Sequence, residues 1–374
     1  MDSKKRMLRR LLRLILPLVL VGIILFCGAK VERKILGPNV DNFYVRAKIT
    51  DVLVDHSTEE FVGIQKVTAV VTHGEHKGES CELDNPNAYH LGAYGGEGIR
   101  IVALVRVTED GTLVGTVYNH DRTPMIYLLV GLFAVVTVLV GGKKGFATLY
   151  ALAFTFLCVV CMYIPLLYVG CNGVLAAIVT SVTILTAAIY IINGWSEKTL
   201  CAVIGTTLGV AVSGLLAMVI GRSFHLSGFN MDEVESMVYI ANSSKLKIGD
   251  ILYAGVLISS LGAVMDVSVS IVAAMDEVRQ HAKDLSRKEL FASGMRVGKD
   301  MIGTMSNTLI LAYTGSATGI MLNAYSNNMP YLRLMSYNSV VIEILCGLCG
   351  TMGVILTVPL QAAITVLFFG KKQK

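Results

Sequence analysis

Hydrophobic residues occur along this chain in long runs that are separated by short polar or charged segments. The runs cover residues 14–27, 125–140, 146–169, 174–192, 200–220, 251–275, 301–322 and 340–369. Most are close to the roughly 20 residues that an α-helix needs to cross the hydrocarbon core of a bilayer. The pattern therefore predicts an α-helical polytopic membrane protein with about eight transmembrane helices.

The segment from residue 31 to residue 123 has a different pattern, because apolar and polar residues alternate there. Alternation is clearest at residues 43–54, 65–72 and 99–107. A period of two residues predicts β-strands, and turn residues at 73–78 and at Asp110-Gly111 would connect them as hairpins. We expect five or six strands that form a small extracytoplasmic all-β domain, an OB-like barrel inserted after the first helix.

Composition agrees with a membrane protein, since 54% of the residues are hydrophobic, 16% are charged and the mean hydropathy is +0.63. The net charge of +5 is modest, and its basic residues cluster before the first run, at residues 143–144 and at the C-terminus. Basic clusters mark the cytoplasmic side. We therefore expect both termini in the cytoplasm, the bilayer as the main partner and no nucleic acid.

Three parts follow from these patterns. Residues 1–30 form a basic cytoplasmic N-terminus and a signal-anchor helix, residues 31–123 the β domain, and residues 124–374 a seven-helix transmembrane domain. The first run also resembles a cleaved signal peptide, with Cys27-Gly28-Ala29 as a weak cleavage site. The polar segment between the runs at 200–220 and 251–275 is assigned outside, and residues 231–241 within it predict a short amphipathic helix.

Polar residues gather in the last three hydrophobic runs. Asp266 and Ser270 are one helical turn apart on one face, and a carboxylate near mid-bilayer costs about 2.5 to 3.5 kcal/mol on insertion scales, so Asp266 should face a protein interior or a wet cavity. The candidate pathway residues are Asp266, Ser270, Asp300, Thr304, Asn307, Thr308 and Glu343. The candidate packing or hinge residues are Gly262, Gly303, Gly315 and Pro359.

Each carboxylate also has a simpler interpretation. Asp266 would fix helix packing through an ion pair or a hydrogen bond, Asp300 would be a favourable charge at the start of its helix, and Glu343 would lie at the outer rim. Asp266 and Asp300 together would form the pair of an intramembrane aspartyl enzyme only if both were deep in the membrane. Asn307 and Thr304 would otherwise join helices through hydrogen bonds.

Oxygen ligands at this spacing suit Na⁺, a proton relay or a polar substrate, whereas a transition metal is disfavoured because no histidine lies in the runs. In the β segment, His73, Glu75 and His76 would form one corner of a metal site only with a further ligand, which the nearby sequence lacks, so they are interpreted as a turn. The cysteine pairs 158/161 and 346/349 are interpreted as packing. A P-loop, a Ser/His/Asp set and an HExxH motif are absent, so we expect no enzyme and no cofactor other than H⁺ or Na⁺ coupling.

The motifs in this region resemble one known family. They are Leu261-Gly-Ala-Val-Met-Asp-Val-Ser-Val-Ser-Ile271, Lys288-Glu-Leu-Phe-Ala-Ser-Gly-Met295 and Gly298-Lys-Asp-Met-Ile-Gly-Thr-Met-Ser-Asn-Thr-Leu-Ile-Leu-Ala-Tyr-Thr-Gly-Ser316. With Gly194-Trp-Ser-Glu-Lys-Thr199 they resemble the YibE/YibF-like bacterial multi-pass membrane proteins. Met295 and Lys299 are minor departures. The resemblance implies the bacterial cytoplasmic membrane, and the family has no settled activity.

The residues themselves therefore carry the functional hypothesis. We expect a membrane transporter or channel-like permease that moves a small solute or ion through a polar site around Asp266 and Asn307, coupled to H⁺ or Na⁺. The alternative is a non-transporting membrane scaffold whose β domain binds an envelope protein, and an intramembrane enzyme is the third choice. Stripes of small residues would also permit a homo-oligomer.

Overall fold

The structure is a computed structural model that describes residues 42–56, 63–87, 92–94, 96–282 and 285–369. The chain divides into two compact units, one formed by Ile35–Leu139 and the other containing Val140–Lys374. The predicted anchor helix in residues 1–30 lies outside the described residues. Each unit is considered by itself below.

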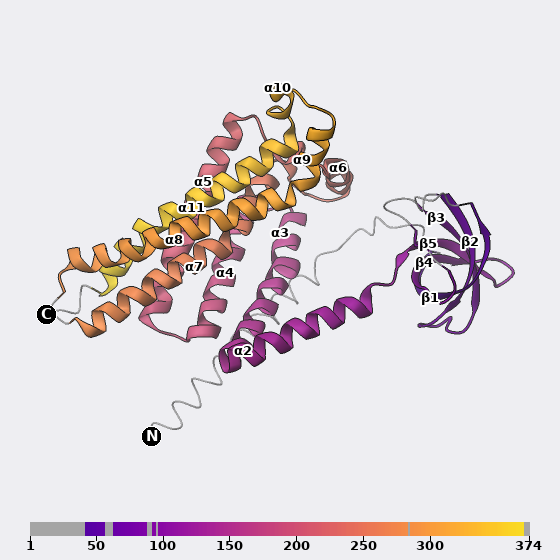
Figure 1. Ribbon diagram of the computed structural model, residues 1–374, viewed down its shortest axis with the longest axis horizontal. Helices are drawn as coiled ribbons and strands as arrows, with labels where there is room; N and C mark the ends of the chain where they lie inside the picture. The colour runs from indigo at the N-terminus through magenta and orange to yellow at the C-terminus, as the bar shows by residue number, and fades with distance from the viewer. Residues whose placement is uncertain (1–41, 57–62, 88–91, 95, 283–284, 370–374) are drawn as a thin grey trace, which may run out of the picture. The chain divides into compact units, whose positions relative to one another are not determined.

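The first unit contains a five-stranded closed barrel (Figure 1). Its strands are β1 (Phe43–Asp55), β2 (Gly63–Val71), β3 (Ser80–Asn87), β4 (Arg100–Val107) and β5 (Leu113–His120). They follow the order β1-β2-β3-β5-β4, and only the pairing of β3 with β5 is parallel. The hairpin predicted at Asp110-Gly111 is confirmed, and Gly111 adopts the positive φ of 77° that such a turn favours.

Alternation along the strands explains why this segment closes into a barrel. In β1, Val45, Ala47 and Ile49 point inward and are buried, while the residues between them are exposed. One end of the interior is polar. There, buried Asn85 donates to Gln65 and to the carbonyl of Ala93, and accepts the Ala93 amide. These bonds satisfy groups that would otherwise destabilise a dry interior.

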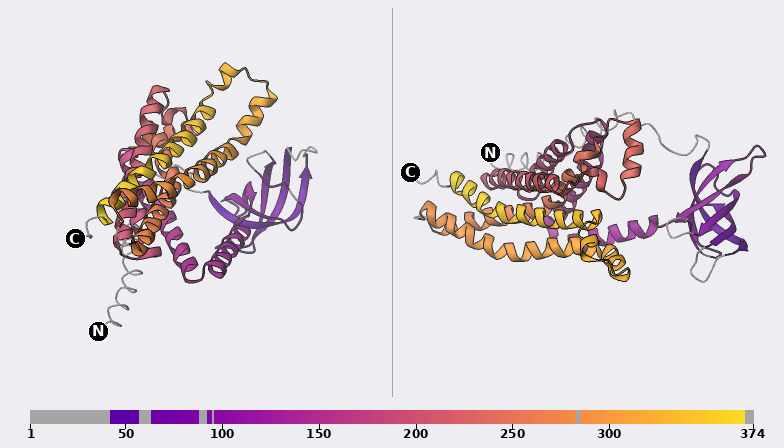
Figure 2. Two further views of the ribbon diagram at one scale, coloured as in Figure 1. Left: turned by 60° about the vertical axis from the view of Figure 1, so that its left-hand side comes forward. Right: turned by 90° about the horizontal axis from the view of Figure 1, so that it is seen from above.

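The remaining elements are helical. They are α2 (Thr123–Cys158), a π-helical turn (Val159–Tyr163), α3 (Ile164–Tyr168), α4 (Gly173–Asn193), α5 (Glu197–Ser223), α6 (Val234–Ser243), α7 (Ile251–His281), α8 (Arg287–Ser316), α9 (Thr318–Ser326), α10 (Tyr331–Leu334) and α11 (Asn338–Phe369). In the second unit α5, α7 and α11 pack against one another. Helix α4 lies against α5 and α7, and α8 lies against α7 and α11 (Figures 1 and 2).

Within the described residues, five helical segments are long and apolar enough to cross a membrane, fewer than the eight expected. Two expected spans, 125–140 and 146–169, belong to one segment, Thr123–Tyr168, which is sharply broken where Gly142 takes φ 54° and ψ −129°. The predicted span 301–322 is divided between α8 and α9, and α8 is too polar to qualify. The predicted amphipathic helix at 231–241 is confirmed as α6.

The hydrophobic pattern also predicts that residues 276–297, between the runs at 251–275 and 301–322, form a basic cytoplasmic loop, and the prediction of a loop was wrong. Helix α7 continues to His281 and α8 already begins at Arg287, so only residues 282–286 connect them. The start of α8 is a capping box, in which the Ser286 hydroxyl accepts the Glu289 amide and the Glu289 carboxylate accepts the Ser286 amide. Arg279 at one end of this region, and Arg287, Lys288 and Arg296 at the other, therefore lie on helices rather than in a loop.

Small residues recur every three or four positions between Gly205 and Gly221, a pattern that predicts close helix packing, and the glycines there do allow the central helices to approach closely. A Cβ atom on Gly209 would lie 2.0 Å from Thr357 Oγ1 of α11, and one on Gly214 would lie 2.3 Å from a methyl group of Leu257 of α7. Both positions leave no space for a side chain.

Candidate functional site

The predicted pathway residues lie on three neighbouring helices. Asp266 and Ser270 are on α7, Asp300, Thr304, Asn307 and Thr308 are on α8, and Glu343 is on α11. Helices α7 and α8 are antiparallel, since Gly294 lies against Met275 while Tyr313, near the other end of α8, reaches Ser259. Because residues in antiparallel helices pair in reverse order, this register brings Asp266 level with the turn that contains Thr304.

Asp266 does not face the interior of the bundle within a single chain. Its side chain is on the exposed side of α7, and Thr304 and Asn307 are on the exposed side of α8. Among the described residues, neither Asp266 nor Asn307 has a hydrogen-bond or ion-pair partner, whereas Thr304 and Thr308 donate to carbonyls of their own helix. The outcome is an open polar strip along α7 and α8, which we call the α7–α8 face: Gly262, Asp266, Gly303, Thr304, Asn307 and Thr308.

Two other candidate residues, Asp300 and Pro359, differ in the structure from what the sequence predicted. Asp300 was expected at the start of its helix but lies in the middle of α8, exposed, because the helix begins at Arg287. Pro359 was considered a helix break, yet α11 runs unbroken from Asn338 to Phe369 with Pro359 inside. The break expected at Gly315-Ser316 is confirmed, since α8 ends at Ser316.

The hinge or packing glycines of the prediction are open positions. A Cβ atom on Gly262, Gly303 or Gly315 would meet no atom within 4 Å. Within the chain, close packing is supplied instead by Gly294 and Gly298, where a Cβ would lie 2.5 Å from the Met275 sulfur and 2.2 Å from Val358. These contacts place α8 in the groove between α7 and α11.

A second polar group forms where α8 ends and α11 begins. The Tyr313 hydroxyl donates to Ser259 of α7 over 2.6 Å. The Ser316 hydroxyl donates to the Tyr313 carbonyl at 2.8 Å, and the Ser316 side chain lies near Glu343. A cavity of about 310 Å³ opens beside them between α8 and α11. Glu343 of α11 thus lines this cavity. The cavity lies on a different side of α8 from the packing contacts at Gly294.

A comparison with protein families gives one result. The family model described as YibE/F-like protein matches residues 129–371, well over half of the chain. The chain belongs to the YibE/F-like protein family. No curated protein and no solved structure matched it.

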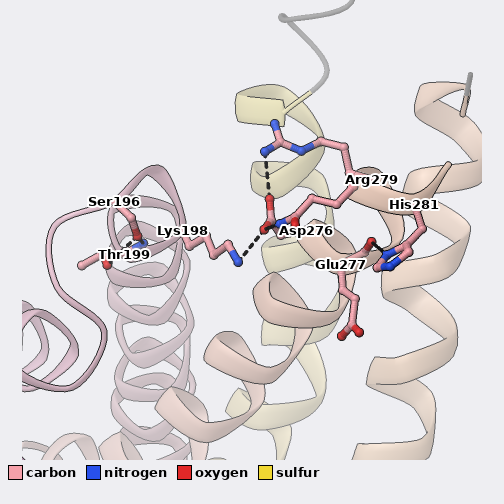
Figure 3. Close-up of polar contacts among 8 residues, drawn as sticks. Ser196, Lys198, Thr199, Asp276, Glu277, Arg279 and His281 are labelled. Atoms are coloured by element: carbon pink, nitrogen blue, oxygen red, sulfur yellow. Dashed lines mark hydrogen bonds and ion pairs between the residues drawn. The ribbon is translucent and has the colours of Figure 1, made fainter. Parts of the chain in front are cut away.

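Among the residues that the structure of this YibE/F-like protein describes, the most deeply buried carboxylate is Asp276, which was not among the predicted site residues. The Asp276 side chain is 1% exposed and accepts from Arg279 at 2.8 Å and from Gln280, while Lys198 of α5 lies 2.5 Å away (Figure 3). Arg279 also stacks on Phe369, 4.2 Å from the ring centre. The sequence did carry one signal for this contact. Arg279 and Gln280 follow Asp276 by three and four positions, and residues at these spacings are neighbours on a helix.

A buried polar ladder on α11 was missed as well. Thr357, Gln361 and Thr365 are 0% exposed and occur at every fourth residue. The Gln361 amide nitrogen donates to the Cys201 carbonyl of α5 and to the Thr365 hydroxyl, and its oxygen lies against Gly205. Gln361 therefore ties α11 to α5 by one hydrogen bond, while the Thr357 and Thr365 hydroxyls donate to carbonyls of α11 itself.

The barrel unit has a polar cavity of its own. It measures about 470 Å³ and is lined by side chains of both charges, Lys66 and Arg106 with Glu82 and Asp84. His73, Glu75 and His76 do not form a metal site, since His76 instead pairs with Glu79 at 2.9 Å and the described residues contain no group of three metal-binding side chains. The barrel therefore offers a charged surface hollow rather than a metal centre.

Proposed function

We propose that this YibE/F-like protein is a membrane transporter or channel-like permease that moves a small solute or ion along the α7–α8 face. Asp266 is the group that a cation or a coupling proton would visit. Thr304, Asn307 and Thr308 would supply hydroxyl and amide oxygens beside it. Coupling to H⁺ or Na⁺ follows from this donor set, because hard cations and protons prefer oxygen.

The observation that carries the proposal is the carboxylate of Asp266, which has no partner among the described residues and lies in the middle of a helix apolar enough to span a membrane. An ionisable group at that depth is costly in lipid and usually marks an ion or substrate path. Helix α8 supports the same proposal, because its exposed side carries amide and hydroxyl groups that cannot form hydrogen bonds with lipid tails. A water-filled path beside both helices accounts for these features together.

The finer topology is part of the proposal. Eight spans would result if residues 14–27, both halves of the segment broken at Gly142, and α8 with α9 all crossed the membrane. Both termini would then be cytoplasmic, and the barrel would lie on the outer side of the bacterial cytoplasmic membrane. The strand order β1-β2-β3-β5-β4 with a parallel β3–β5 pair supports the OB-like assignment.

Flux in proteoliposomes tests the function. Wild type, Asp266→Asn and Glu277→Gln would be compared for ion currents and pH changes across a panel of cations and small solutes. Glu277 is a matched control, because it is an exposed carboxylate on the same helix. Loss of flux in Asp266→Asn alone, with normal elution on size exclusion, supports the proposal. Equal flux in both variants would remove Asp266 from the path.

A scaffold is the second candidate, and the barrel cavity favours it. Lys66, Arg106, Glu82 and Asp84 give that cavity charges of both signs, which suits an envelope protein or a zwitterionic ligand. If the scaffold hypothesis is right, no solute in the panel moves with wild-type protein. Charge reversal at Lys66 and Arg106 would then abolish capture of a partner from envelope extracts while leaving the helical unit folded.

A further inference from the structure

The cavity between α8 and α11 has the composition of a binding site for a small amphiphile. It holds about 310 Å³ and is lined mainly by apolar side chains, including Ile310, Met321, Leu334 and Leu348. Among the described residues that line it, Glu343 alone carries a charge. Ligand sites in proteins commonly combine an apolar wall with a few convergent polar groups. Its lining residues come from the helical unit, from α8, α9, α10 and α11, and these four helices are labelled in Figure 1.

Within the part of the chain that the structure describes, Glu343 has no cationic partner. None of the ion pairs among the described residues includes it, and the charge that acts on it most directly is the negative one of Asp232. Asp232 is itself held by the Ser339 hydroxyl at 2.6 Å. A carboxylate beside apolar walls is costly unless it is paired with a positive charge. The local field therefore favours a cation at this position.

The geometry points to a ligand with an apolar body and a protonated amine: the body fills the cavity between α8 and α11, and the ammonium group binds the Glu343 carboxylate. Tyr313, held by Ser259, closes one side of the cavity and gives it a fixed wall. This site stands apart from transport along the α7–α8 face, since it uses none of Asp266, Thr304 or Asn307.

Binding of phenylbutylamine to the full-length protein in lipid nanodiscs tests the assignment. Phenylbutanol is the neutral probe of the same shape, and empty nanodiscs give the background from partition into lipid. Wild type should bind the amine saturably and at least about tenfold more tightly than the alcohol, because a charge-assisted hydrogen bond is stronger than a neutral one. Glu343→Gln should lose that preference, while Glu277→Gln, the same change at the other end of the bundle, should keep it.

A second variant tests the cavity itself. A Cβ on Gly347 would make only ordinary contact with Tyr313, at 3.6 Å, so Gly347→Val should fold, fill the cavity and weaken both probes. Equal binding of amine and alcohol by wild type would overturn the cationic assignment and indicate a neutral occupant such as a lipid chain. An unchanged amine preference in Glu343→Gln, or no saturable binding above empty nanodiscs, would overturn the site.

Discussion

The ammonium group of Lys198 lies 2.5 Å from the carboxylate of Asp276 and joins the first turn of α5 to the last turns of α7. The Asp276 side chain is 1% exposed. Its two cationic partners are more accessible, since the Lys198 side chain is 48% exposed and the Arg279 side chain is 29% exposed. The carboxylate is thus the buried centre of the contact, and the cations reach it from the surface. This arrangement fixes one end of the bundle, away from the cavity at Glu343.

Removing the Asp276 charge should destabilise the helical unit. We expect Asp276→Asn to lower the free energy of unfolding by on the order of 2 kcal/mol, less than a fully buried pair would lose, because Lys198 and Arg279 can turn to water. Thermal unfolding in detergent measures it. Glu277→Gln, an exposed neighbour, should stay within about 0.5 kcal/mol of wild type. Identical melting of wild type and Asp276→Asn would show that the contact contributes nothing to stability.

The barrel should show a pH dependence that comes from Asp121. Burial opposes ionisation of this carboxyl, but hydrogen bonds from Thr123 and the positive charges of Arg46 and Arg100 outweigh it, so its pKa lies below the ordinary 3.8. A folded-state pKa below the unfolded value means that Asp121 stabilises the fold above the ordinary pKa. That stabilisation disappears as the pH falls through the folded-state pKa.

The test compares wild type with Asp121→Asn. Cys81 reports on the barrel, because its side chain is 1% exposed inside it. In protein whose other cysteines are replaced by serine, labelling of Cys81 by dithiodipyridine, which reacts with thiols in acid, follows barrel unfolding in urea. Asp121→Asn should unfold at lower urea than wild type at pH 7, and the two should converge well below pH 3.8. A gap that persists in acid would assign the effect to something other than the charge.

The barrel was predictable because its signals are local. Alternation in β1 and the turn at Asp110-Gly111 lie within a few residues of sequence, and both appear where they were expected. The parallel pairing of β3 with β5 joins Cys81 to Leu113. Nothing in the local pattern of either strand encodes such a partner, so strand order needed the structure.

The helical unit was less predictable, since periodicity shows which residues share a face but not what that face meets. Asp266 and Ser270 do lie on one side of α7, yet that side is exposed at Asp266 and only half-buried at Ser270. Residues 287–300 include many charged side chains, which are typical of a loop, but Gly294 and Gly298 give α8 a close-packing face against α7 and α11. Burial of Asp276 likewise depends on Lys198, which lies far away in sequence.

Thiol labelling tests which side of the membrane the loops occupy. Cys171 is exposed in the short link between α3 and α4, which the proposed topology places outside. Cys81 would also be outside, but burial raises its pKa to about 11 and leaves little reactive thiolate. A membrane-impermeant maleimide should therefore label intact cells through Cys171. Cys171→Ser should abolish the signal, and labelling only after the membrane is opened would reverse the topology.

Substitutions at Gly209 and Gly262 distinguish packing inside the chain from contacts made by the α7–α8 face. A Cβ on Gly209 would lie 2.0 Å from Thr357 and 2.8 Å from Val264, so Gly209→Ala should cost roughly 1 to 3 kcal/mol through overpacking. A Cβ on Gly262 would meet nothing within 4 Å. Since alanine favours a helix over glycine by about 1 kcal/mol, Gly262→Ala should leave an isolated chain as stable as wild type or slightly more stable.

A larger side chain at Gly262 tests whether a second copy of the chain covers the α7–α8 face. A polar strip beside Asp266 is poorly suited to lipid, and small residues let helices of two protomers approach closely. If two copies meet there, Gly262→Leu should convert a dimer to a monomer in multi-angle light scattering, with the melting temperature of the monomer unchanged. If the path is lined within one chain, Gly262→Leu should reduce flux without changing the molar mass, because the new side chain would project beside Asp266, one turn along α7.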